Sequence, residues 1–256
     1  MTTNLSYGDS QLDEEWGTTF AEIQKESDID NIFVCHVKIS DLEKIASKLS
    51  NKVMDNSWIM ELDPGARHTY QQTVAETAGI LVNKIKDQLS MEDKVSSEFG
   101  EIMVSMGASR ALEVIFDHIS VPLAELWKPK ASGNEGFDFH TVCPNKLINF
   151  GEAKFSSSSS PYGGNTGESR GAGGQADGFI SQDKHHRDRP LLTDLGTEEG
   201  AISNLKNQLF GVVLAFSMTR SNPLDTFRKA IRKAANYQHL EKAKNIYLVG
   251  VTHASE

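Results

Sequence analysis

Cysteine is scarce in this sequence: the 256 residues include only two, Cys35 and Cys143. Two cysteines are too few for the disulfide framework that stabilises many small secreted domains. Each one lies in an apolar segment, so we expect both to be buried free thiols. This pattern favours a reducing, cytoplasmic setting.

Long apolar runs are missing as well. No stretch approaches the roughly 18 consecutive apolar residues that indicate a membrane-spanning helix. The opening residues, MTTNLSYGDS, contain neither a basic start nor an apolar run, so we expect no secretion signal. A membrane partner is therefore not expected.

Positive charge is in deficit, with a formal net charge of −9. The deficit is concentrated in residues 1–30, where eight acidic residues and one lysine give −7, whereas residues 220–244 carry seven basic and two acidic residues, hence +5. A basic stripe of this kind can follow a phosphate backbone, although a solvated helix face has the same composition. The predicted DNA contacts in this stripe are Arg228, Lys229, Arg232 and Lys233.

The hydrophobic pattern predicts an α/β fold in two parts. Residues 1–90 would form an acidic, mostly helical, partner-binding region, and residues 91–256 a domain with a mixed central sheet flanked by helices. The first 17 residues are polar and are expected to be loose. Strands are predicted at 31–39 and 245–253, and helices at 41–49, 67–89, 91–115, 175–182, 200–218 and 222–240. The Ser- and Gly-rich run Ser156–Gly174 is expected to be a mobile surface loop.

Residues 136–143 (GFDFHTVC) and 146–155 (KLINFGEAKF) read as a β-hairpin around Pro144-Asn145. Glu152 and Lys154 stand two residues apart on the second strand, so their side chains project from the same face. Asp138 lies on the first strand. It can face Glu152 only if the loop holds an odd number of residues, most simply 144–146, with Cys143 opposite Leu147.

Two acids and a lysine converging at the end of a sheet indicate metal-dependent phosphodiester hydrolysis. Mg²⁺ prefers oxygen ligands and retains water. The ion generates hydroxide from bound water and stabilises the charge that develops at phosphorus. A nearby lysine can orient the attacking water or stabilise the phosphate. Both Asp138 and Glu152 would hold the metal, and Lys154 would position water or phosphate.

An E-x-K triplet alone is weak evidence, because about one is expected by chance in a chain of this length. The sequence contains a second one, Glu92-Asp93-Lys94. The copy at 152–154 differs in its setting, since apolar residues surround it and an aspartate precedes it by one hairpin. A salt-bridged edge strand is the alternative interpretation.

GFDFH, the hairpin and INFGEAKF together resemble the second and third motifs of the PD-(D/E)xK nuclease superfamily. The resemblance implies a restriction-endonuclease-like sheet and a further metal-binding glutamate on a preceding helix. Glu98, in SEFGE, matches that placement, and Glu101 on the same helix face is the competing choice; a solvated acid pair is the alternative for both. Gln175, in GGQADGF, matches the polar residue that some members carry after the lysine.

More narrowly, SEFGE, GFDFH and GEAKF in this order resemble the HamA family, the nuclease component of the Hachiman antiviral system. That resemblance covers residues 95–250 and implies an ATP-driven helicase partner. The long Ser/Gly loop after Lys154 departs from the family pattern.

The function expected from these features is hydrolysis of DNA by a Mg²⁺-dependent nuclease, with Mn²⁺ as an alternative ion, without sequence specificity and together with a helicase in antiviral defence. Two rivals remain: a stand-alone restriction endonuclease, and an inactive nuclease fold that serves as an interaction module. Zinc is not expected, because His140 with Cys143, or His185-His186 with Asp188, lack a recognised ligand spacing. These histidines are expected at the surface.

Overall fold

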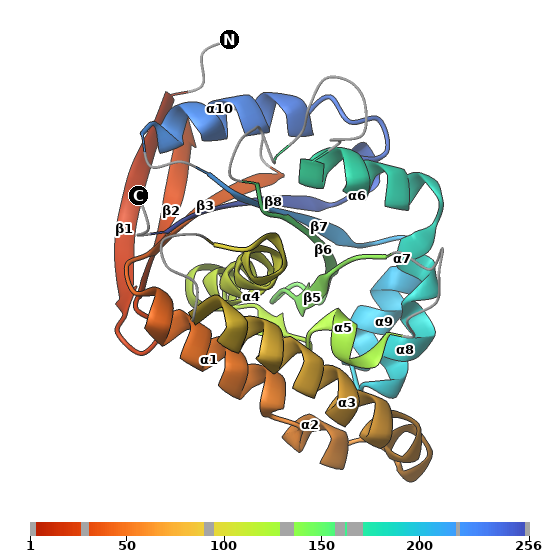
Figure 1. The fold of residues 1–256 in the computed structure, drawn as a ribbon. Coiled ribbons are helices and arrows are strands. Elements are labelled where there is room, and N and C mark those ends of the chain that lie inside the picture. The colour runs from red at the N-terminus through yellow and green to blue at the C-terminus, as the bar shows by residue number, and fades with distance from the viewer. Residues whose placement is uncertain are drawn as a thin grey trace.

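The computed structural model describes residues 4–26, 31–89, 95–128, 136–156, 162, 171–218 and 221–253. A single eight-stranded mixed sheet runs through the molecule, in the order β1-β2-β3-β8-β7-β6-β5-β4 (Figure 1). The strands are β1 (Asn4–Asp13), β2 (Thr18–Glu26), β3 (Ile32–Ile39), β4 (Ile119–Ser120), β5 (Phe139–Val142), β6 (Ile148–Lys154), β7 (Gly211–Ser217) and β8 (Asn245–Thr252).

The four central strands, β3, β8, β7 and β6, are mutually parallel, while the outer strands pair antiparallel. The parallel strands lie in register, so their carboxyl ends meet at one edge of the sheet. Open α/β sheets bind their ligands at that edge. Lys154 is the last residue of β6, and β5 begins beside it with Phe139.

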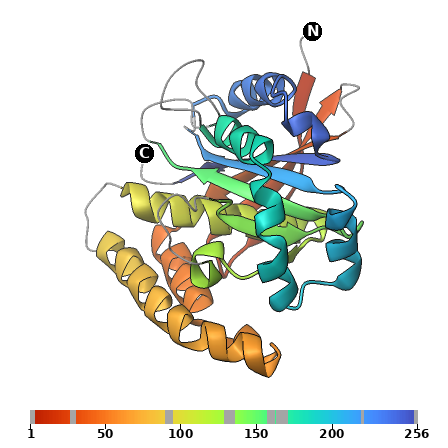
Figure 2. The ribbon, with the colours of Figure 1, turned by 90° about the vertical axis from the view of Figure 1, so that its right-hand side faces the viewer.

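Helices cover both faces of the sheet. In Figures 1 and 2, α6 and α10 lie on one face and α4 on the other, with α1 and α3 outside α4. The helices are α1 (Leu42–Met54), α2 (Ser57–Met60), α3 (Pro64–Leu89), α4 (Ser97–Phe116), α5 (Ala124–Trp127), α6 (Gly171–Ser181), α7 (Lys184–Arg187), α8 (Arg189–Asp194), α9 (Glu199–Lys206), α10 (Pro223–Ala234) and the 3₁₀ turn η1 (Leu240–Lys242).

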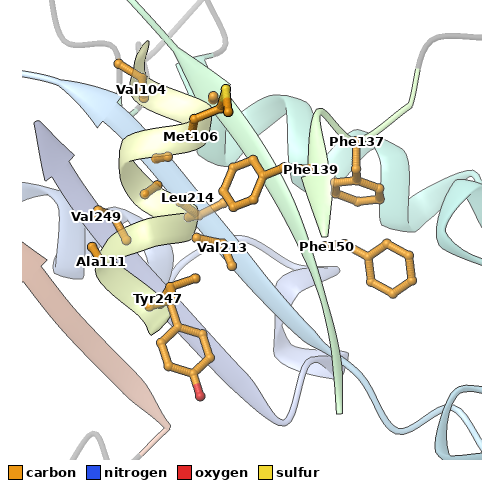
Figure 3. Close-up of a cluster of buried hydrophobic side chains, with 14 of the residues drawn as sticks. Val104, Met106, Ala111, Phe137, Phe139, Phe150, Val213, Leu214, Tyr247 and Val249 are labelled. Atoms are coloured by element: carbon orange, nitrogen blue, oxygen red, sulfur yellow. The ribbon is translucent and has the colours of Figure 1, made fainter. Parts of the chain in front are cut away.

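The core lies on both faces of the sheet, and between α4 and the sheet side chains from strands distant in sequence meet (Figure 3). Phe139 lies near Met106 of α4, whereas Phe137 and Phe150 pack together away from that helix, with ring centroids 5.2 Å apart. The segment entering β5 therefore places neighbouring residues in different packing environments. Burial of these large side chains fixes the hairpin that carries the predicted acids.

Most of the predicted elements are confirmed, including the α/β class and the mixed sheet flanked by helices. Asp41 caps α1 by accepting a hydrogen bond from the Lys44 backbone N–H at 2.9 Å. The strand predicted at 31–39 is β3, and the basic amphipathic helix is α10. Both cysteines are buried and free.

The expectation of a loose start is wrong, because residues 4–13 form β1. This strand pairs with β2 at the edge of the sheet and is largely exposed, so it carries no alternating apolar signal. The region 1–90 contributes three strands as well as α1–α3, and its strands belong to the same sheet as those of residues 91–256.

The helix predicted at 200–218 is also wrong. Residues 199–206 form α9, and residues 211–217 (GVVLAFS) form β7, which is buried on both faces. A continuous apolar run of this length fits a buried strand as well as a buried helix. The predicted loop Ser156–Gly174 lies mostly outside the described residues, but its last four residues begin α6.

Candidate functional site

The β5–β6 hairpin has the register that brings Asp138 opposite Glu152. Phe139 pairs with Gly151 and Val142 with Ile148. The turn is closed by Cys143, whose N–H donates to the Leu147 carbonyl at 3.1 Å. Its three-residue loop ends in Lys146 at φ 58°, as is typical of hairpins with a left-handed third loop residue. The predicted odd loop is therefore confirmed.

Asp138 lies directly before β5 and is fixed by backbone contacts to β6. Its N–H donates to the Gly151 carbonyl at 2.8 Å, and its Oδ2 accepts a hydrogen bond from the Ala153 N–H at 2.7 Å. Burial raises the pKa of Asp138 to about 6, although Lys154 and the Ala153 amide act in the opposite direction. Asp138 is therefore held at the strand end as a weak acid.

Glu152 is fully buried, with a side-chain exposure of 0%. Its Oε1 lies 3.0 Å from Nζ of Lys154, and within the described ranges neither carboxylate oxygen has a partner in hydrogen-bonding geometry. Burial raises the pKa of Glu152 well above its usual value, and the charge of Asp138 adds to the effect. The ion pair with Lys154 compensates this burial only in part, because Oε2 has no partner among the described residues and an unsatisfied oxygen in a buried carboxylate is costly.

Lys154 joins these acids to helix α4. Its ammonium lies 3.0 Å from Glu152 and 3.8 Å from Oε1 of Glu101. Burial by itself lowers the pKa of Lys154, but the negative charges of Glu152, Asp138 and Glu101 outweigh it and raise the pKa. The lysine thus remains protonated beside the acids.

Helix α4 comes close to the end of β6 because Gly100 leaves room for a ring. A Cβ at Gly100 would lie 2.2 Å from the ring of Phe155. Ser96 caps the start of this helix, because its Oγ accepts a hydrogen bond from the Phe99 N–H at 3.3 Å. This packing holds Glu101 next to Lys154.

Four acidic side chains line one cavity of about 190 Å³ at this edge, which we call the acidic cavity. Its acids are Glu98, Glu101, Glu125 and Asp138. Of the two competing helix residues, Glu101 approaches Lys154, whereas Glu98 is two-thirds exposed and pairs with Lys84 at 3.3 Å. The geometry therefore brings Glu101 nearer to the buried acids than Glu98.

Glu125 was not anticipated from the sequence. It lies on the short helix α5, and its negative charge contributes to the raised pKa of Asp138. Its segment, PLAELW, matches no motif, and only the folding of α5 against α3 brings it to the cavity. No sequence signal pointed to it.

A second feature missed from the sequence is a buried ionic network behind Asp138. The ammonium of Lys128 donates to the Phe137 carbonyl at 2.8 Å and to Oδ2 of Asp188 at 2.7 Å, and the same oxygen lies 2.9 Å from Nε2 of His140. His140 and His185 are buried, so the expectation of surface histidines is wrong for both. The network therefore holds Phe137 and His140 in place on either side of Asp138.

Two sets of residues that the sequence predicted as part of the functional site lie away from the acidic cavity. Gln175 is half-buried on α6, which packs on β6 and β7, and it is not among the residues that line the acidic cavity. The basic residues Arg228, Lys229, Arg232 and Lys233 lie on α10, on the other face of the sheet from α4 (Figure 1). Lys229 pairs with Asp225 at 2.7 Å.

Over the ranges that the structure describes, no three Asp, Glu, His or Cys side chains converge closely enough to form a ready-made metal site. The donor set nevertheless suits a hard divalent cation, because carboxylate oxygens are its preferred ligands. Glu152 has unsatisfied oxygens, and repulsion between Glu152 and Asp138 raises the pKa of Glu152. A cation would relieve both penalties.

Among the described helices, none is long and apolar enough to cross a membrane. Comparison of the chain with family models, with curated proteins and with solved structures finds no match.

Proposed function

We propose that the chain is a Mg²⁺-dependent nuclease with a restriction-endonuclease-like core that hydrolyses DNA phosphodiester bonds. The observation that carries the proposal is Glu152, a fully buried carboxylate with unsatisfied oxygens beside Asp138 and Lys154. Buried polar groups in folded proteins are normally bonded, and acids with strongly shifted pKa values cluster at functional sites. The position of these groups at the carboxyl edge of the parallel strands supports the same conclusion.

Asp138 and Glu152 would hold the metal, with Glu101 as a further ligand in preference to Glu98. Bound Mg²⁺ supplies hydroxide from a water ligand and stabilises charge developing at phosphorus, and Mn²⁺ suits the same oxygen ligands. Lys154 would orient the attacking water or the phosphate, because its ammonium stays charged beside Glu152.

DNA would reach the site across a surface whose charge is mostly negative. The net charge of −9 gives the chain little non-specific affinity for a polyanion. Helix α10 offers the phosphate contacts, which read no sequence. A partner that grips DNA would supply the missing affinity, and the resemblance to HamA implies a helicase in antiviral defence.

The rival interpretation is a non-catalytic interaction module, which the absence of an assembled ligand set in the described ranges favours. Binding of Mg²⁺ separates the two functions. Calorimetric titration of the isolated chain should show a Mg²⁺ site that Glu152→Gln removes; a module would bind no Mg²⁺ at this position. A stand-alone restriction endonuclease would instead cut DNA at defined sites.

The direct test is cleavage of supercoiled plasmid with Mg²⁺, alone and with the product of any neighbouring helicase gene. Glu152→Gln keeps the shape of the side chain but removes its charge, and should lower the cleavage rate at least a hundredfold. Glu92→Gln, in the other E-x-K triplet, is the matched control and should cut like the wild type. Equal cleavage by wild type and Glu152→Gln would refute the assignment.

A further inference from the structure

A second cavity adjoins the acidic cavity and has no role in the chemistry proposed above. It measures about 240 Å³ and lies between α1, α2, α4 and the β4–α5 segment. Ser105 and Leu123 line both cavities. Phe139, which follows Asp138 in the chain, also lines the second one. The two cavities are therefore neighbours that share part of one wall.

The walls of this second cavity are mainly apolar and aromatic, with hydroxyl groups among them. Trp58, Phe139 and Met106 supply apolar surface, while Ser109 and Ser120 supply hydroxyls that bond to each other at 2.6 Å. Flat, hydrogen-bonding groups are what such a lining accommodates.

The indole N–H of Trp58 has no hydrogen-bond partner among the described residues, although it is shielded from solvent. Because this N–H has almost no accessible surface, the cavity does not expose it, and Trp58 contributes aromatic surface to the wall.

Charge argues against a phosphate or another anion as the occupant. Lys52 is the only cation in the lining, all of which is described, and its ammonium pairs with Glu113 at 3.3 Å. Asp55, also in the lining, accepts a hydrogen bond from the Ser57 N–H at 3.0 Å. The occupant should be uncharged, and flat enough to lie against the aromatic wall.

We infer that this cavity receives an unpaired nucleobase next to the phosphate held at the acidic cavity, so that the substrate is single-stranded or frayed DNA. The inference rests on the proposed function, because only a nucleic-acid substrate at the acidic cavity would present a base to its neighbour. A base in a duplex cannot enter a pocket in the protein without leaving the stack, which costs free energy that a single strand does not lose. Stacking on aromatic side chains is the usual means of holding such a base.

The test uses the full chain carrying Glu152→Gln, which should bind DNA without cutting it. A fluorescein-labelled 15-mer of thymidine is titrated at low salt, beside a duplex of equal length and a 15-mer with one central abasic site. We expect the single strand to bind at least tenfold more tightly than the duplex, and the abasic strand to bind several-fold more weakly than the intact one.

Two substitutions then locate the base. Trp58→Leu removes the aromatic ring from the wall and should reduce the preference for single strands, whereas Trp58→Phe keeps a ring there and should retain most of the preference. Trp16→Phe, outside the cavity, is the control and should keep the preference. Circular dichroism and the thermal midpoint establish that each variant is folded.

Unchanged single-strand preference in folded Trp58→Leu would overturn the inference, as would equal binding of the abasic strand. The two proposals can fail separately. Trp58-dependent binding in a chain that never cuts plasmid or oligonucleotide would retain the base pocket and refute the nuclease. Mg²⁺-dependent cutting with no effect of Trp58 would retain the nuclease and refute the pocket.

Discussion

At the scale of single residues, Glu152 differs most from what the strand pattern suggests. Glu152 and Lys154 stand two residues apart on the strand, so their side chains are predicted to share one face of the sheet. Catalytic groups of this kind are expected to face solvent. The structure buries Glu152 completely, because β6 lies inside the sheet with α4 and α6 packed against it. Substitution by alanine would therefore leave a void as well as removing a charge, so glutamine is the cleaner probe.

The raised pKa values of Asp138 and Glu152 predict a link between pH, Mg²⁺ and stability. Asp138 shifts from 3.8 to about 6, and Glu152 shifts upward too. In this range the folded chain keeps protons that the unfolded chain has lost. These two acids therefore lower the free energy of unfolding as pH rises through their folded-state pKa values, by on the order of 3 kcal/mol for Asp138.

Because Mg²⁺ binds the ionised carboxylates, it should raise the thermal midpoint clearly at pH 8 and little at pH 5. Differential scanning fluorimetry at both pH values measures this shift. The double variant Asp138→Asn, Glu152→Gln should lack the response. Because this variant keeps the buried histidines, its difference from the wild type measures the contribution of the two acids alone. A Mg²⁺ shift of equal size at pH 5 and pH 8 would contradict the prediction.

At the scale of elements, the site depends on the contact between α4 and the end of β6. Gly100→Ala would drive a methyl group into the Phe155 ring. We expect a loss of about 1–3 kcal/mol of stability and, because Glu101 moves away from Lys154, slower cleavage. Urea unfolding and plasmid cleavage measure the two effects.

Gly79→Ala on α3 is the matched control. A Cβ at Gly79 meets nothing within 4 Å, so alanine should stabilise the helix by about 0.5–1 kcal/mol and leave cleavage unchanged. If both alanine variants behaved alike, close packing at Gly100 would not be the reason for its position.

Elements were predictable from the sequence where their signals are local. The capping aspartate Asp41 and the two strands around Pro144-Asn145 follow from spacing and turn residues, and the odd hairpin loop follows from the condition that Asp138 faces Glu152. The β7 strand was not, because GVVLAFS is buried on both faces and shows no alternation. The acidic cavity was predictable only in part, since Glu125 reaches it only through tertiary packing, and the Lys128–Asp188 pair behind Asp138 has no local signal either.

At the scale of the whole molecule, the polarised charge has a structural basis. The acidic residues 4–26 form the β1–β2 hairpin at one edge of the sheet, and the basic helix α10 contacts β1. Some of these acids have fixed partners, as Asp13 pairs with Arg110 at 2.9 Å. Deleting the first 17 residues would remove β1 and the buried Trp16 along with the charge, so substitution is the appropriate test.

We predict that the acids of the β1–β2 hairpin weaken DNA binding by the isolated chain beyond their contribution to the net charge. Asp9→Asn, Glu14→Gln and Glu15→Gln neutralise three exposed acids of the β1–β2 region. Together they should tighten binding several-fold at low salt, and the gain should vanish as added salt shortens the screening length to about 3 Å near 1 M.

The control, Glu43→Gln, Glu61→Gln and Glu76→Gln, changes the net charge equally at exposed positions of α1–α3. Anisotropy titrations over a salt series compare the two triple variants. An equal gain in both would show that net charge alone limits binding, and no gain in either would show that the acidic hairpin does not weaken binding.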